Sequence, residues 1–136
     1  MDQLSSAMSV AVSGMRAQST RMRVVSENIA NSQSTALDPN SDPYRRKVVL
    51  FRNFLERETG STLVHAARIV NDKSSFKLQY EPNHPAANDE GYVKYPNINS
   101  LIESMDLREA QLSYRANINV MRTARSMQSS TIDLLR

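Results

Sequence analysis

The sequence predicts a mainly α-helical fold with a small β-rich insertion. Long N- and C-terminal helices are expected to pair as a coiled-coil-like core, with a β and loop module between them. Apolar residues recur at helical spacing over residues 3–31 and 98–135, whereas all five prolines and the β-branched runs lie between these segments. The 136 residues include no Trp and only three Gly, which disfavours a dense aromatic core and a β-sandwich with many tight turns.

Residues 3–31 are expected to form one amphipathic helix, roughly 43 Å long at 1.5 Å per residue. Its apolar positions alternate in steps of four and three, which is typical of a coiled-coil seam. The seam consists of Leu4, Met8, Ala11, Met15, Gln18, Met22, Val25 and Ile29. We expect Met8, Met15, Met22, Val25 and Ile29 to provide the packing contacts of this helix.

Residues 98–135 are also expected to form a single helix, with Pro96 before it and Asn97 or Asn99 as its cap. Its main apolar ridge consists of Ile98, Leu101, Met105, Leu112, Ala116, Val120, Met127 and Leu134, and a neighbouring ridge holds Tyr114, Met121 and Leu135. Arg108, Arg115 and Arg122 recur every seven residues. They are either a solvated face or salt-bridging positions beside a helix contact.

Residues 36–97 are predicted to form the β-rich and loop module. KVVLF (47–51), STLVHAARIV (61–70) and SSFKLQY (74–80) have the composition of strands, although the second could in part be helical. Residues 81–97 hold three prolines and an Asn-Asp pair and are predicted to be a loop. The chain thus divides into segments 1–35, 36–97 and 98–136, with the two outer segments forming one inner-core domain.

Catalytic chemistry is not indicated. His65 and His84 lie in different predicted elements, a strand and a loop. No nucleophile elbow, glycine-rich phosphate loop or metal-ligand spacing is present, and there is no Cys. We therefore expect no enzyme activity, no cofactor, no metal and no small-molecule substrate.

Charge and hydropathy bear on the partners. The net charge is +3 and the pI about 9.4, but the charges are spread over all three segments, which argues against nucleic acid. The N-terminus lacks a basic region followed by a long apolar run, so no cleavable signal peptide is expected. No segment approaches the roughly 20 apolar residues of a membrane span, so direct membrane insertion is not expected.

The methionine-rich seams indicate helices that need several partners. Met is flexible and suits surfaces that meet more than one neighbour. Small or polar residues such as Ala11, Gln18 and Ala116 dilute both seams, so a lone helix pair has little apolar area to bury. We expect the terminal helices to be poorly ordered alone and to order when several copies pack together.

Several segments carry a family resemblance. Residues 13–35, SGMRAQSTRMRVVSENIANSQST, resemble the N-terminal helix of the axial proteins of the bacterial flagellum, which ends in N-[IL]-A-N-x-x-T. DPYRRKVVLF (42–51), EPNHPAANDEGYVKYPNIN (81–99) and SYRANINVMRTARSM (113–127) are similar to the members that form the proximal rod. The chain departs from the family at Asn40 and Ser41, where glycines are common, and at Arg115, where Gln is common.

The resemblance implies a structural subunit of the proximal rod of the basal body, which crosses the periplasm and transmits motor torque to the hook. Implied partners are copies of the chain, other rod proteins, the basal-body ring or export-gate adaptor and, transiently, the flagellar type III export apparatus, with export needing no cleaved signal. The expected assembly contacts, besides those of the N-terminal helix, are Tyr44, Arg45, Arg46, Met105, Leu112, Tyr114, Arg115, Asn117, Val120, Met127 and Leu134.

Asn28 and Asn31 are interpreted as a register lock in such an assembly. Asn is unfavourable inside a helix, because its amide competes for backbone groups, but a buried or half-buried Asn specifies register. Both are expected to lie off the apolar seam and to form side-chain hydrogen bonds with backbone at the helix end or across subunits. We expect Asn28→Ala to impair assembly while leaving the single chain little changed.

Two other classes of binding protein remain open at this stage. The chain could be a helical adaptor or export chaperone of another secretion assembly, which would have stable helices in solution. It could also be an amphipathic protein of the membrane surface, although Arg16, Arg21 and Arg23 are few basic residues for that role.

Overall fold

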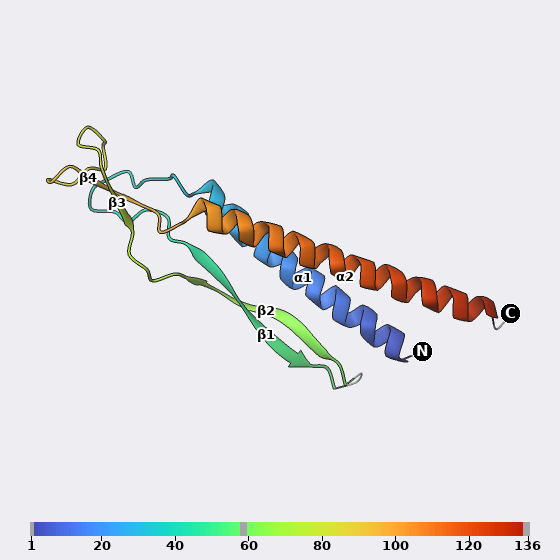
Figure 1. Cartoon of the computed structure of the whole chain (residues 1–136). Coiled ribbons are helices and arrows are strands. Elements are labelled where there is room, and N and C mark those ends of the chain that lie inside the picture. The colour runs from blue at the N-terminus through green and yellow to red at the C-terminus, as the bar shows by residue number, and fades with distance from the viewer. Residues whose placement is uncertain (1, 58–59, 135–136) are drawn as a thin grey trace. The chain divides into compact units, whose positions relative to one another are not determined.

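The computed structural model describes residues 2–57 and 60–134, which form two long helices separated in sequence by two small hairpins. The elements are α1 (Asp2–Ala30), β1 (Lys47–Leu55), β2 (Thr62–Asn71), β3 (Lys77–Tyr80), β4 (Tyr92–Tyr95) and α2 (Ser100–Leu134) (Figure 1). The terminal helices pack together, which confirms the predicted mainly α-helical fold with a β-rich insertion. Leu135 of the predicted ridge lies outside the described residues.

Local hydrogen bonds fix the inner ends of both helices. The helical bonding of α1 ends as the Asn31 amide donates to the Glu27 carbonyl at 3.1 Å and the Ser32 amide to that of Ile29 at 3.2 Å. α2 begins at Ser100, where Asn99 Oδ1 accepts from the Leu101 amide at 3.1 Å, an N-cap bond. Of the two predicted candidates, Asn97 and Asn99, the structure thus selects Asn99 as the cap.

The contacts divide the chain into two compact units, and each helix contributes to both. Unit 1 comprises Met1–Met22, Val49–Arg68 and Arg108–Arg136, and unit 2 comprises Arg23–Val48 and Ile69–Leu107. The division of the sequence into segments 1–35, 36–97 and 98–136 remains a prediction.

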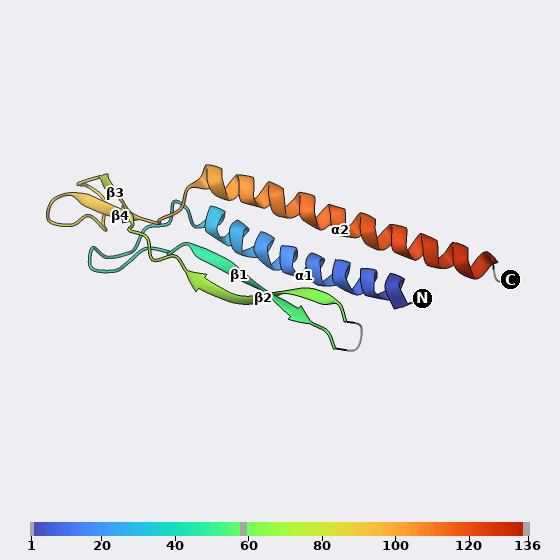
Figure 2. The same cartoon turned by 60° about the horizontal axis from the view of Figure 1, so that its bottom comes forward.

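Unit 1 is built around small side chains. Its buried core residues are Ala11, Ala17, Ala110 and Ala124. Gly14 of α1 lies so close to Asn117 of α2 that a Cβ at Gly14 would lie 2.7 Å from the Asn117 amide nitrogen. The hairpin β1–β2 lies along α1 here, where the Val64 amide donates to Ser13 Oγ at 3.3 Å and the hydroxyls of Ser6 and Ser61 hydrogen-bond (Figure 2). Small residues thus allow close backbone approach in this unit.

Unit 2 has larger buried residues, namely Val24, Val25, Val93 and Ile98. Its antiparallel hairpin pairs Lys77 with Tyr95 and Tyr80 with Tyr92. The Tyr80 and Tyr92 rings meet edge to face, with centroids 5.4 Å apart.

One sequence prediction about the strands is corrected, and an alternative left open for a second strand is decided. Residues 92–95 were expected to be a loop but form β4. Antiparallel pairing with β3 supplies hydrogen-bond partners for their backbone groups, and the strand ends just before Pro96. Residues 62–71 are strand throughout, and no part of them is helical. The β-branched composition therefore predicted the secondary structure of this segment correctly. Its partner in the hairpin is β1, which extends to Leu55.

Gly91 allows a test of the β3–β4 hairpin. Its φ is +83°, and a Cβ there would lie 2.8 Å from the Tyr80 ring and 3.2 Å from Pro82 Cβ. We expect Gly91→Ala to lower the free energy of unfolding by about 2–3 kcal/mol, measured by urea denaturation.

Gly60→Ala is the matched control for that variant. Gly60 also has a positive φ, +65°, but a Cβ there meets nothing within 4 Å. We expect it to cost only the backbone penalty of about 1–2 kcal/mol. Equal losses for the two variants would show that the contact with Tyr80 and Pro82 has no effect.

Candidate functional site

Asn28 is the centre of a buried polar cluster in unit 2. Its side chain is fully buried. The amide nitrogen donates to the Lys47 carbonyl at 2.8 Å and to Glu103 Oε2 at 2.9 Å. The amide oxygen accepts from the Lys47 backbone N–H at 3.0 Å and from the Tyr44 hydroxyl at 3.2 Å. All four hydrogen-bonding positions of the amide are therefore used.

Glu103 is the second fully buried polar residue of this cluster, and it comes from the first turn of α2. Arg46 Nε donates to Glu103 Oε1 at 2.6 Å, so the buried carboxylate has a cation beside it. Arg46 also reaches Asp72 at 3.4 Å and Asp106 at 3.8 Å. Burial alone lowers the pKa of Arg46, but Glu103 and Asp72 raise it by more, and the guanidinium stays charged.

Asn97 connects the cluster to the loop after β2. Its side-chain oxygen accepts from the Arg46 amide at 2.8 Å, and its nitrogen donates to Ser74 Oγ at 2.8 Å. Burial raises the pKa of Tyr44, so its hydroxyl remains a donor to Asn28 at neutral pH. We call Asn28, Tyr44, Arg46, Lys47, Asp72, Asn97 and Glu103 the polar junction.

The junction corrects one expectation about Asn28 and supports another. Asn28, which was expected beside the apolar seam, is buried between α1 and α2, with the carboxylate of Glu103 opposite it. The expected side-chain hydrogen bonds to backbone are confirmed for both asparagines, since Asn31 donates to the Glu27 carbonyl at 2.8 Å. The expectation that Asn28→Ala leaves the single chain little changed does not fit these buried contacts, because the substitution removes the partner of several buried groups.

Sequence reasoning found part of this junction. Asn28, Tyr44 and Arg46 were singled out as assembly residues, and the structure brings them together within one chain. Arg45 lies nearby, with its guanidinium 4.2 Å from the centre of the Phe76 ring. The missed residues are Asp72 and Glu103. Glu103 could have been found from the sequence, because it is a charged residue that continues the four-and-three spacing of Leu107, Ala110 and Tyr114 on one side of the helix.

The apolar residues of α2 that were predicted as its packing contacts are exposed in the single chain. Ala110, Ala124 and half-buried Tyr114, Asn117 and Met121 lie on the inner side of the helix, on or beside the ridge that was predicted as secondary. Apart from Ile98, which is buried, the predicted main ridge is exposed: Met105 63%, Leu112 67%, Val120 49%, Met127 54% and Leu134 87%. In α1, Val25 is buried, whereas Met8, Met15, Met22 and Ile29 are half-buried. The main ridge of α2 therefore adds little to the core of a single chain.

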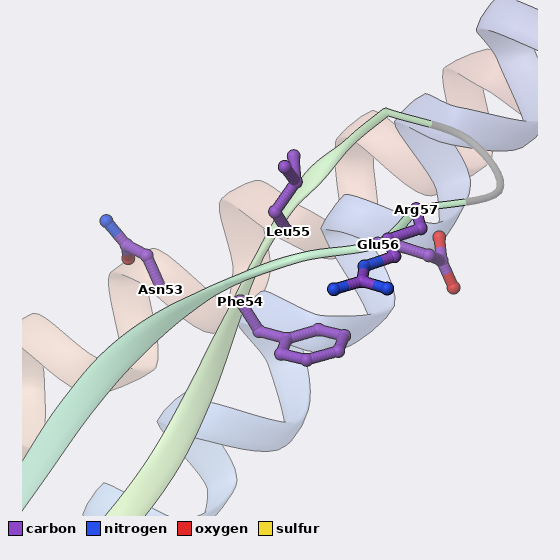
Figure 3. A pocket seen from close by; sticks show the side chains of 5 residues that line it. All are labelled: Asn53, Phe54, Leu55, Glu56 and Arg57. Atoms are coloured by element: carbon purple, nitrogen blue, oxygen red, sulfur yellow. The ribbon is translucent and has the colours of Figure 1, made fainter.

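No convergent chemical site accompanies these features in the part of the chain that the structure describes. An open hollow of about 620 Å³ is lined by consecutive residues Asn53–Arg57, and Figure 3 shows the Phe54 and Leu55 side chains pointing away from one another. His65 is an exposed strand residue, and His84 is a loop residue whose Nδ1 accepts from the Ala86 amide at 3.0 Å. The described ranges 2–57 and 60–134 hold no group of His, Asp and Glu that could bind a metal.

Neither helix among the described residues is both long and apolar enough to cross a bilayer.

The junction predicts a large effect of Asn28→Ala on the single chain. The substitution leaves buried groups of Lys47, Glu103 and Tyr44 without partners, so we expect the free energy of unfolding to fall by about 2–3 kcal/mol. Near-UV circular dichroism during urea denaturation is the measurement, because Tyr44, Tyr80, Tyr92 and Tyr95 lie in unit 2. Asn31→Ala is the matched control and should cost less than about 1 kcal/mol, since only one bond is lost. A similar loss in both variants would contradict this account.

The carboxylates predict a dependence on acid pH. Hydrogen bonds from Lys47 and Arg23 lower the pKa of Glu27 below 4.5, and the Ser74 amide, with Arg46, lowers that of Asp72 below 3.8. A depressed folded-state pKa stabilises the fold above the unfolded-state pKa, and the effect is lost as pH falls through the folded value. We expect the urea midpoint to drop between about pH 5 and about pH 3. Asp72→Asn should reduce the drop, and an unchanged profile in that variant would contradict the assignment.

Two family models match the chain at its ends. The model described as flagella basal body rod protein matches residues 8–36, and the one described as flagellar basal body rod FlgEFG protein C-terminal matches residues 89–134. The first covers the end of α1 with Asn28, and the second covers β4 and α2 with Glu103. The matched residues thus include both helices that meet at the polar junction.

Full-length relatives are similar over nearly the whole chain. The flagellar basal-body rod protein FlgC of Agrobacterium fabrum is 49% identical over 136 residues, covering 100% of this chain and 98% of the relative. FlgC of Salmonella typhimurium is 37% identical over 92% of each chain, and that of Borreliella burgdorferi is 35% identical over 98% of each. The chain belongs to the FlgC family of flagellar basal-body rod proteins and is a structural, non-enzymatic rod subunit that assembles with other rod subunits.

Proposed function

We propose that the chain is a subunit of the proximal part of the rod and that it contacts its neighbours through the outward face of α2. The observation that carries the proposal is the exposure of large apolar side chains along that helix. Met105 and Leu112 are more exposed than buried, and Leu134 is almost fully exposed. A row of such side chains is costly to leave in water, and in a family that assembles into a rod it marks a packing surface.

The neighbours in this proposal are copies of the chain and other rod proteins. We propose Met105, Leu112, Val120, Met127 and Leu134 as the contacts of α2, and Met8, Met15, Met22, Val25 and Ile29 as those of α1. The half-buried methionines of α1 suit this role, because Met adapts to neighbours of different shape. Tyr114, Arg115 and Asn117 lie among the α2 positions, and their part in assembly stays a prediction.

The polar residues near the junction have a second role within this proposal. Asn28, Asn31, Tyr44, Arg45 and Arg46 already make contacts within the chain. We propose that they act on assembly indirectly, because they fix where the end of α1 and the start of α2 lie. The surface presented to neighbours then has one defined register.

The physical role of the assembled rod follows from these contacts. A shaft that transmits torque must resist twisting, and many parallel helix contacts supply that stiffness better than one strong contact. We propose that the rod built from these subunits spans the periplasm and carries motor torque to the hook. The basal-body ring or export-gate adaptor is its proposed neighbour at the base. Passage through the flagellar type III export apparatus, without a cleaved signal, is the proposed route.

The outward face of α2 is tested by a double variant, Met105→Gln with Met127→Gln. Gln has nearly the length and helix propensity of Met, so we expect less than about 0.5 kcal/mol change in single-chain stability. Removal of the apolar contacts should instead reduce the number of complete rods, counted by electron microscopy of basal bodies, and the swimming radius in soft agar.

Leu37→Gln is the control for this experiment, because Leu37 is 89% exposed but lies in the loop after α1. Its swimming radius should equal that of the parent strain. A double variant that swims normally and builds a normal number of rods would rule out this face as an assembly surface.

A further inference from the structure

Charge is divided unequally between the two units. Unit 1 carries ten arginines and no lysine against five Asp and Glu residues, a net charge of +5. Unit 2 carries three arginines and four lysines against nine Asp and Glu residues, a net charge of −2. Arg forms bidentate pairs with carboxylates and is enriched in protein interfaces, where Lys is depleted. The distribution thus suggests that the positive charge of unit 1 meets a protein surface.

The arginines of α2 form one exposed stripe. Arg108, Leu112, Arg115, Asn119 and Arg122 follow one another in steps of four and three, and all five are exposed. Such steps place residues on one side of a helix. We call these five residues the arginine stripe. Its apolar member, Leu112, is 67% exposed, so the stripe combines cations with an apolar contact.

The stripe is not neutralised within the chain. In the described part of the chain, Arg108, Arg115 and Arg122 have no hydrogen-bond or ion-pair partner. The acidic residues that lie nearest in the sequence of α2 are already engaged: Glu109 binds Arg21 at 3.0 Å, and Asp106 binds Arg46 at 3.8 Å. Three guanidinium groups at seven-residue spacing therefore remain available for an acidic partner.

A rigid acidic turn in unit 2 has the complementary chemistry. Asp89 and Glu90 lie in the connection between β3 and β4, and both are exposed. Asn88 fixes the turn, since its side-chain oxygen accepts from the Glu90 amide at 3.1 Å and from the Tyr92 amide at 2.8 Å. Neither carboxylate has a partner among residues 2–57 and 60–134. A turn that is already ordered loses little entropy when it binds.

We propose that the arginine stripe of one copy binds the Asp89–Glu90 turn of a second copy. The inference rests on the proposed function, since it names one of the contacts through which copies assemble. The surfaces differ, so the contact is heterologous: the copy that uses its stripe keeps its turn free, and the copy that uses its turn keeps its stripe free. Such a contact extends along a series of copies instead of closing into a symmetric dimer, which suits a rod.

Charge reversal in the full chain tests this contact. We expect Arg115→Glu to weaken self-association, measured by sedimentation velocity at low salt, by at least about tenfold. The double variant Asp89→Arg, Glu90→Arg should weaken it similarly. Self-association of the unaltered chain should fall as salt rises, because the pairs are exposed. Arg52→Glu is the matched control, since Arg52 is an exposed arginine of unit 1 outside the stripe, and it should have a much smaller effect.

Mixing the two variants identifies the partner. The chain with Arg115→Glu and the chain with Asp89→Arg, Glu90→Arg should associate with each other, because one stripe and one turn then have opposite charges again. Near-UV circular dichroism checks that both variants keep the unit 2 fold. Folded variants whose mixture fails to associate would show that the stripe does not bind this turn, and would overturn the proposal.

A second readout separates this contact from the proposed function. Arg115→Glu that leaves self-association unchanged also overturns the contact, whatever the swimming radius of the strain. Normal rods in that strain together with the expected defect of Met105→Gln, Met127→Gln would overturn the contact alone. Normal rods with both sets of variants would remove the role of the α2 face as well.

Discussion

The polar junction around Asn28 is the constraint on which the rest of unit 2 depends. One buried amide joins three parts of the chain that are far apart in sequence: the end of α1, the start of β1 through Lys47, and the first turn of α2 through Glu103. A buried amide and a buried carboxylate are both unfavourable unless every group is paired. The arrangement is therefore favourable in only one register, whereas apolar side chains would tolerate a shift by a turn.

Close helix packing in unit 1 has a consequence for the large apolar residues. Ala11, Ala17, Ala110 and Ala124 fill the core, and Gly14 lets Asn117 approach. Small side chains bury little area, so this contact alone stabilises a single chain only weakly. Leu112, Val120 and Met127 of α2 lie outside it and are exposed. The expectation that the terminal helices order fully only when several copies pack is consistent with this arrangement, and it stays a prediction.

The sequence predicted the helices well, because long periodic patterns depend mainly on local chemistry. The ends of α1 and α2 lie within two residues of the expected ones, and Asn99 caps α2 as proposed. β4 was missed because only its pairing with β3 makes it a strand, and that partner lies outside the local sequence. The flanking prolines and Gly91 were typical of a loop, and they do occupy the connections around the strand.

The site was predicted less well, for a reason that concerns all assembling proteins. Choosing the largest apolar residues of α2 selected the ridge of Met105, Leu112 and Val120, which faces away from the core of the chain. That choice assumes that the strongest apolar pattern lies inside, and the assumption holds for a monomer. Glu103 was overlooked because an acidic residue in the first turn of a helix has a sufficient explanation in the helix dipole. The spacing of Glu103 was a weak signal, and its partners Arg46 and Asn28 are identified only by the three-dimensional contacts.

Hydrogen bonds and apolar contacts therefore have different roles in this rod subunit. Hydrogen bonds are directional, and the junction uses them where one geometry must be selected within the chain. Apolar burial is non-directional and scales with area, and in the proposed assembly the exposed large side chains of α2 become buried between subunits. A subunit that buried the large residues internally would be more stable alone and would have less free energy left for assembly. Exposing them while fixing the register with Asn28 keeps the chain specific in its fold and competent to assemble.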